Sequence, residues 1–227
     1  MIDVKKELMD SSDLKNKEFQ AIIIPGASDI LGVRTPVVRE ISKKICKDDW
    51  RAFLNEPVIF YEERILRALV IANAKMEFDE RLELTKKFVP EIDNWAVCDV
   101  FCGDWKVKGE SDKERLWEYC LELLDTDDEF KMRVSAVMML AHFLDDQYID
   151  DVLRLLTSKN HKGYYYKMGA AWTLSYCYIK YPEKTEPMLF MDSLDREIRN
   201  KAVQKISDSF RVSKEDKERL KAKKKAC

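Results

Sequence analysis

The amino-acid sequence predicts an all-α protein built as a right-handed superhelical solenoid of stacked helical repeats. Apolar residues recur at helical spacing along most of the 227-residue chain, and no segment of useful length alternates as a strand would. Six Gly and six Pro leave little sequence for loops or sheets. The third observation is a period, because Asp99, Arg133 and Lys167 are spaced 34 residues apart. Such a period is typical of stacked helix pairs.

Helix boundaries follow from proline, glycine and capping residues. Pro25-Gly26 ends the first clear helix, Pro36 fits the first turn of the next, and Pro90 breaks a later pattern. Asp93 or Asn94 can cap the helix that follows. The expected helices cover residues 14–24, 36–45, 60–74, 79–88, one that begins after 94, and then about 112–124, 128–143, 147–156, 163–181, 182–191, 194–210 and 213–225.

The repeat is also visible in the local sequence. Residues 133–137, 167–171 and 199–203 each place an alanine three positions after a cation, and Arg64 begins a similar segment 35 residues before Asp99. Equivalent residues of stacked repeats form a stripe along one face of the solenoid. We therefore expect a mostly cationic concave face that contains one carboxylate. One continuous domain is expected over residues 1–227, with a basic helix at 211–227.

The charge distribution limits the expected affinity for nucleic acid. The chain carries a net charge of −2, whereas a protein that binds phosphate usually has a basic excess. Residues 211–227 hold eight Lys or Arg and three Asp or Glu, a net charge of +5, which leaves −7 on the remainder. A lysine-rich terminus of this kind is either a solvated helix end or an arm that contacts phosphate.

Several other classes of protein are disfavoured. Cys98 and Cys102 are four residues apart, but the two histidines, His142 and His161, do not complete a zinc site with them, so no metal is expected. No apolar run approaches the roughly 18 residues of a membrane span, and the N-terminus lacks the pattern of a secretory signal. The expectation is a cytoplasmic monomer with reduced thiols.

Trp95 and Asp99 are the residues that point most directly to chemistry. A spacing of four places the indole and the carboxylate on one helical face, so both can line one cleft. A carboxylate repels phosphate but stabilises an oxocarbenium-like transition state of glycosidic cleavage. Trp95 and Trp172 could face a cationic base, and Arg133 could clamp a phosphate.

Four segments carry a family resemblance: Leu31-Gly32-Val33-Arg34-Thr35-Pro36, Asn94-Trp95-Ala96-Val97-Cys98-Asp99, Lys131-Met132-Arg133 and Met168-Gly169-Ala170-Ala171-Trp172. In this order and spacing, the chain resembles the alkylpurine DNA glycosylases built from HEAT-like repeats, the AlkD family, over essentially its whole length. The resemblance implies excision of cationic N3- or N7-alkylated purines from duplex DNA, without metal or cofactor.

The resemblance also implies roles for individual residues. Asp99 would assist the sugar carbon, Trp95 and Trp172 would contact the lesion nucleotide, and Arg133 would hold the DNA backbone. The sequence departs from the family pattern at residues 173–176, where the family often places an arginine. One phosphate contact is therefore expected to be missing.

Further phosphate contacts are expected from Lys167 in the stripe and from Lys106 and Lys108, although the last two could simply belong to a solvated loop. Asp99 could instead form a structural ion pair with Arg133. The alternative function is a non-catalytic helical-repeat scaffold that binds a protein or an unusual nucleic-acid structure. A basic groove with Asp99 exposed at its floor favours the enzyme, and a neutral or acidic groove favours the scaffold.

Overall fold

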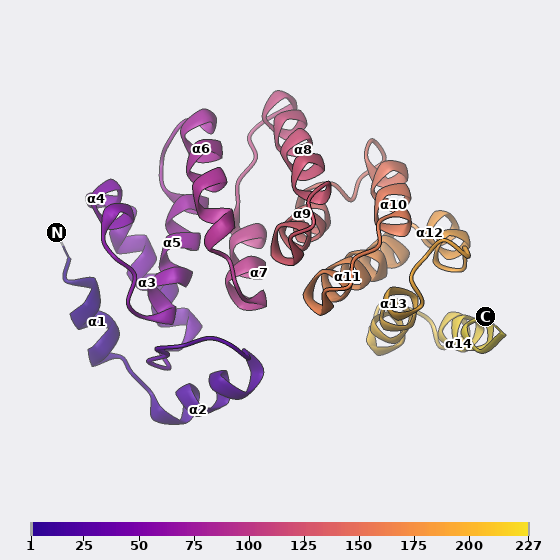
Figure 1. The fold of residues 1–227 in the computed structure, drawn as a ribbon, viewed down its shortest axis with the longest axis horizontal. Coiled ribbons are helices and arrows are strands. Elements are labelled where there is room, and N and C mark those ends of the chain that lie inside the picture. The colour runs from indigo at the N-terminus through magenta and orange to yellow at the C-terminus, as the bar shows by residue number, and fades with distance from the viewer. Residues whose placement is uncertain (1, 227) are drawn as a thin grey trace. The chain divides into compact units, whose positions relative to one another are not determined.

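The computed structural model describes residues 2–226, which form fourteen α-helices, one 3-10 turn and no strand (Figure 1). Contacts within the chain group into two compact units, Met1–Asp112 and Lys113–Cys227. Unit 1 contains α1 (Val4–Asp10), α2 (Leu14–Ile23), α3 (Thr35–Ile45), α4 (Trp50–Asn55), α5 (Tyr61–Asn73), α6 (Phe78–Phe88), η1 (Val89–Glu91) and α7 (Trp95–Asp104). Helix α8 (Glu110–Leu124) begins at the end of unit 1. Unit 2 continues with α9 (Glu129–His142), α10 (Ile149–Ser158), α11 (Tyr164–Lys180), α12 (Pro182–Leu189), α13 (Arg196–Asp208) and α14 (Lys214–Ala226).

In unit 1, helices α3, α5 and α7 pack side by side in chain order, and α6 packs against α5. Helix α5 is the centre of this row, and Leu66 and Leu69 on it are almost fully buried. Val38 and Ile41 of α3 and Phe101 of α7 complete the core on either side. Burial of one such side chain stabilises the fold by roughly 1.5–3 kcal/mol. This row is the rigid frame on which the N-terminal ends of the three helices are positioned.

The turn that joins α2 to α3 is fixed by a buried carboxylate. Glu62, at the start of α5, is 1% exposed, and its two carboxylate oxygens accept the backbone N–H groups of Leu31 (3.1 Å), Gly32 (2.7 Å) and Val33 (3.1 Å). Gly32 has a φ of +84°, and a Cβ there would lie 2.2 Å from the carbonyl oxygen of Asp13. The turn and α2 therefore touch backbone to backbone at a position that only glycine fits.

In unit 2, α11 lies between α9 and α13 and packs against both. Small residues permit the close approach to α9: Gly169 faces the side chain of Arg133, and the Thr173 hydroxyl donates to the Ala136 carbonyl at 2.7 Å. Helices α10 and α12 pack against each other on α11. Each unit thus contains a row of three helices that pack side by side, with one or more further helices packed against the row. The prediction of an all-α helical-repeat fold is confirmed.

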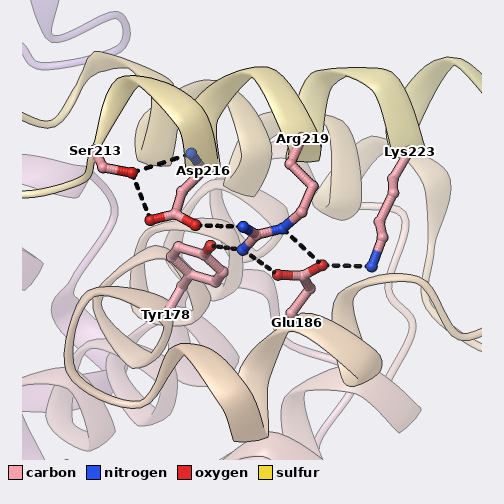
Figure 2. Close-up of polar contacts among 6 residues, drawn as sticks. All are labelled: Tyr178, Glu186, Ser213, Asp216, Arg219 and Lys223. Atoms are coloured by element: carbon pink, nitrogen blue, oxygen red, sulfur yellow. Dashed lines mark hydrogen bonds and ion pairs between the residues drawn. The ribbon is translucent and has the colours of Figure 1, made fainter.

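The basic C-terminal segment forms α14, which is docked on unit 2 (Figure 2). Leu220 is fully buried, and Glu186 of α12 binds Arg219 (2.8 Å) and Lys223 of α14. The Arg219 guanidinium also donates to the Tyr178 hydroxyl at 3.2 Å. Of the two interpretations of this segment, the structure shows a helix held by its own ion pairs, with other lysines left at the surface.

Most expected helices are present with boundaries that differ by a few residues. Helices α1 and α4 and the turn η1 were not expected, because each is too short to show a hydrophobic period. The segment expected at 194–210 is shorter, because Asp195 caps the start of α13 and the helix ends at Asp208. The expectation of a single continuous domain stays a prediction.

The Glu186 cluster predicts a pH-dependent contribution to stability. The hydrogen bond from Arg219, with that from Lys223, lowers the pKa of Glu186 below its usual 4.5. Its contribution is therefore complete above pH 4.5 and is lost as pH falls through the lower folded-state pKa. We expect Glu186→Gln to lower the free energy of unfolding by about 1 kcal/mol or less at pH 7 and by a smaller amount at pH 3. Urea unfolding at both pH values measures this, with Glu183→Gln, exposed on the same helix, as the control.

Candidate functional site

An open cleft of about 470 Å³ lies in unit 1 where the N-terminal ends of α3, α5 and α7 meet α2. Trp95 and Asp99 of α7 both line it, as the spacing of four residues predicted. Its other walls are largely apolar and include residues of α2, the following turn, α3 and α5: Phe19, Ile23, Ile24, Val33, Pro36, Val38, Tyr61 and Ile65.

Trp95 is held in place from both sides of the cleft. The Asn94 side chain caps α7 by accepting the N–H groups of Ala96 (3.1 Å) and Val97 (3.0 Å), so one of the two expected capping residues is used. The indole N–H of Trp95 donates to the carbonyl of Ile23, the last residue of α2, at 2.9 Å. Trp95 is half-buried, so it is a wall of the cleft and not a plain core residue.

Asp99 is half-buried one turn after Trp95. Two other charged residues line the cleft. Glu62 is committed to the backbone of the turn, and Arg34 is paired with Asp13 at 2.8 Å. Asp99 is the carboxylate of α7 that lines the cleft, among apolar and aromatic walls. Such a site suits a flat cation better than a phosphate, because the carboxylate repels an anion.

Sequence reasoning missed Gln20, which also lines the cleft. Its Oε1 atom is buried without a hydrogen-bond partner, which is costly unless something else supplies a donor. A ligand with an N–H group could do so. In the sequence, Gln20 is simply a polar residue within an expected helix, four positions before Ile24. Such residues are too common for this one to be singled out.

The periodic residues do occupy equivalent places, in the first or second turn of α5, α7, α9, α11 and α13. The cations of α5, α9 and α11 bind the start of the next helix in the row, whereas Arg199 of α13 donates to the Leu189 and Met191 carbonyls at the end of α12 and just after it. Lys167 forms ion pairs with Glu197 (2.9 Å) and Asp195 (3.0 Å), which raise its pKa. Arg133 is 4% exposed and donates to the Tyr165 carbonyl at 2.8 Å. Arg64 pairs with Asp93, before α7.

These contacts correct the expectation of a mostly cationic groove made by the stripe. The spacing predicted where the cations lie. It did not predict that acidic side chains and backbone carbonyls at the start of neighbouring helices would bind them. Arg133 is buried, which does not fit a direct contact with phosphate, and the Lys167 side chain is 13% exposed. In this structure both residues join neighbouring helices of unit 2.

Lys106 and Lys108 are exposed, but they do not join the cleft. They follow the C-terminal end of α7, whereas Trp95 begins that helix. A helix of this length is about 15 Å long. Trp105, which immediately precedes Lys106, is buried, and its indole N–H donates to the Thr85 hydroxyl at 2.9 Å.

Trp172 lines a different groove, of about 410 Å³, within unit 2. Tyr176 lies one turn further along α11, with the two rings edge to face at 6.2 Å between centroids. The guanidinium carbon of Arg211, from the linker between α13 and α14, lies 5.7 Å from the centroid of the Tyr176 ring. A cation thus lies beside the turn where the sequence lacks the expected arginine.

The family model for DNA alkylation repair enzyme matches residues 4–206, which is most of the chain. The chain belongs to this family. Membership is consistent with the helical-repeat fold, and it indicates a role in DNA repair and an interaction with DNA. No curated protein matches the chain by sequence similarity. The match includes both the cleft and Trp172 and ends before the linker that carries Arg211.

Two properties of the described residues bear on metal binding and on membrane insertion. Between residues 2 and 226, no three His, Cys, Asp or Glu side chains gather as a group that could hold a metal ion. No helix of that range has the length and hydropathy to cross a membrane.

The position of Arg133 predicts a structural effect when it is removed. Arg133→Ala should leave the Tyr165 carbonyl without its charged donor and lower the free energy of unfolding by about 1.5–3 kcal/mol. Urea unfolding measures the loss. The control is Lys131→Ala, which removes a more exposed cation from the same helix. Unchanged stability in Arg133→Ala would return this residue to a role in binding.

Proposed function

We propose that this member of the DNA alkylation repair enzyme family is a DNA glycosylase that excises cationic N3- or N7-alkylated purines from duplex DNA. The observation that supports this best is the position of Asp99 beside Trp95 in a largely apolar cleft. A methylated purine carries its positive charge on a flat ring, which matches an indole face and a carboxylate. The cation–π contribution of such an indole is roughly 0.5–2 kcal/mol.

The chemistry needs little from the protein because the substrate is already activated. When the bond between C1′ and the purine nitrogen breaks, both electrons go to the purine, which leaves as a neutral base. No acid is therefore needed to protonate the leaving group. The sugar develops oxocarbenium character, which the Asp99 carboxylate stabilises. Water then adds to C1′ and releases a proton, which Asp99 can accept.

Contacts with the duplex backbone are proposed for cations that remain at the surface, among them Lys106 and Lys108. Arg133 and Lys167 contribute indirectly, because they fix the helices of unit 2 that present Trp172. With a net charge of −2, the affinity for DNA should be weak and its dependence on salt shallow. Each phosphate contact that is lost should reduce the slope of log K against log salt by about 0.9.

The decisive experiment measures base release. A duplex with a single N7-methylguanine or N3-methyladenine is incubated with the protein, and free base and abasic strand are quantified against spontaneous loss. We expect release that depends on protein concentration and is absent for undamaged guanine and adenine. A folded protein that binds this duplex and releases no base above the spontaneous rate would rule out the proposal.

A second candidate function is the non-catalytic scaffold, and one observation favours it. Helix α2 has no buried residue and exposes Leu14 (78%) and Ile22 (77%), an unusual apolar surface that suits a partner. Binding without excision in the assay above, with unchanged binding after Asp99→Asn, would favour this function.

A further inference from the structure

The groove around Trp172 combines three aromatic rings, one of them fully exposed, with cations. Phe210 is fully exposed although it is a large apolar residue, so it contributes nothing to the packing of unit 2. Arg211 follows it and lies against the Tyr176 ring. Lys205, exposed on the last turns of α13, lines the same groove, as does the carboxylate of Asp208.

The short linker that carries Phe210 and Arg211 is fixed at both ends. It begins where α13 ends, and the N–H of Arg211 donates to the Ser209 hydroxyl at 3.2 Å. At the other end, the Ser213 hydroxyl accepts the N–H of Asp216 at 3.1 Å and caps the first turn of α14. Helix α14 is held in turn by Glu186 (Figure 2). The exposed ring is therefore presented on a rigid support, which reduces the entropy lost on binding.

We propose that this groove binds an unpaired nucleotide of a DNA strand, with the base stacked on Phe210 and the adjacent phosphate on Arg211. An exposed aromatic ring beside a cation is the arrangement that binds single strands without reading their sequence, because every base has a π-face. A base inside a duplex cannot stack on the ring, since both of its faces are already covered. Lys205 adds a second cation, so positive charge exceeds the charge of Asp208.

This inference extends the proposed function but does not depend on excision. The family match ends at residue 206, so Phe210 and Arg211 lie in a part of the chain that the family model does not cover. The cleft that holds Trp95 and Asp99 is built from other helices. The test therefore uses undamaged DNA, for which no chemistry occurs.

The experiment measures the affinity of the full chain for a fluorescent single-stranded oligonucleotide of mixed sequence and for its duplex, by anisotropy at low salt. We expect Phe210→Ala to weaken binding of the single strand about tenfold and to affect the duplex little. Phe210→Leu should also weaken binding. This variant keeps an apolar side chain but has no aromatic ring on which a base can stack. Phe210→Trp should retain it.

Arg211→Ala tests the phosphate contact, and Arg154→Ala is its matched control. Arg154 is an exposed arginine of α10, paired with Asp151, and its loss changes the net charge equally. We expect Arg211→Ala to weaken binding of the single strand and reduce its salt slope by about 0.7, and the control to do neither. Because Phe210 and Arg211 are exposed, the variants should keep the wild-type circular dichroism and melting temperature.

Two outcomes would overturn the inference. One is an unchanged affinity of Phe210→Ala for the single strand. The other is an equal loss of affinity of Phe210→Ala for the single strand and for the duplex, which would indicate that the groove binds the duplex backbone. If the wild type excises no methylated base yet binds single strands through Phe210, the proposed function fails and this inference stands. If the wild type excises the methylated base but Phe210→Ala binds single strands as well as the wild type does, this inference fails and the proposed function stands.

Discussion

Replacing Asp99 with asparagine should reduce the excision of methylated purines by a factor of about ten or more while binding of the duplex is kept. The substitution preserves the size of a half-buried side chain on α7 and removes its negative charge. The charge matters only when the sugar becomes cationic, so the loss falls on the transition state. A tenfold effect corresponds to about 1.4 kcal/mol. Single-turnover release of base from a duplex with N7-methylguanine measures it.

The matched control is Asp93→Asn, which removes an equal charge from the residue two positions before α7. Asp93 pairs with Arg64 and does not line the cleft. Its excision rate should stay close to that of the wild type. Equal rates for wild type and Asp99→Asn, with both proteins folded, would assign Asp99 to a structural role.

The helices and the register of the repeats could be predicted from the sequence because both depend on local periodicity. The spacing of 34 residues placed Asp99, Arg133 and Lys167 at equivalent points of α7, α9 and α11, where the structure has them. The spacing of four likewise placed Trp95 and Asp99 at one cleft. These are the predictions that need only the geometry of a single helix or of one repeat.

The use of each charged side chain could not be predicted in the same way. Lys167 is paired with Asp195 and Glu197, which are about 30 residues away, and the buried Arg133 donates to a backbone carbonyl. Both partners depend on how one helix packs against the next. Phe210 was also missed, because its exposure is a property of the folded linker and not of the local pattern.

Replacing Glu62 with alanine should cause the largest loss of stability in unit 1. Three backbone N–H groups of the turn at residues 31–33 would lose their acceptor, and an unsatisfied buried group costs about 1–3 kcal/mol. The free energy of unfolding should fall by at least about 3 kcal/mol, a large part of the 5–15 kcal/mol that is typical of a domain. Asn16 of α2 donates to the Gly32 carbonyl at 2.8 Å, so α2 should also become less firmly attached to the rest of unit 1.

The loss should extend to function because α2 and this turn form one side of the cleft. Urea unfolding gives the change in stability, and hydrogen exchange at Leu31, Gly32 and Val33 shows whether the turn opens first. Glu62→Gln should be milder, since its amide oxygen can still accept from Gly32 and Val33. Glu40→Ala, which removes an exposed carboxylate paired with Lys43, serves as the control. If Glu62→Ala were as stable as this control, the turn would be held by its contact with α2 and not by the buried carboxylate.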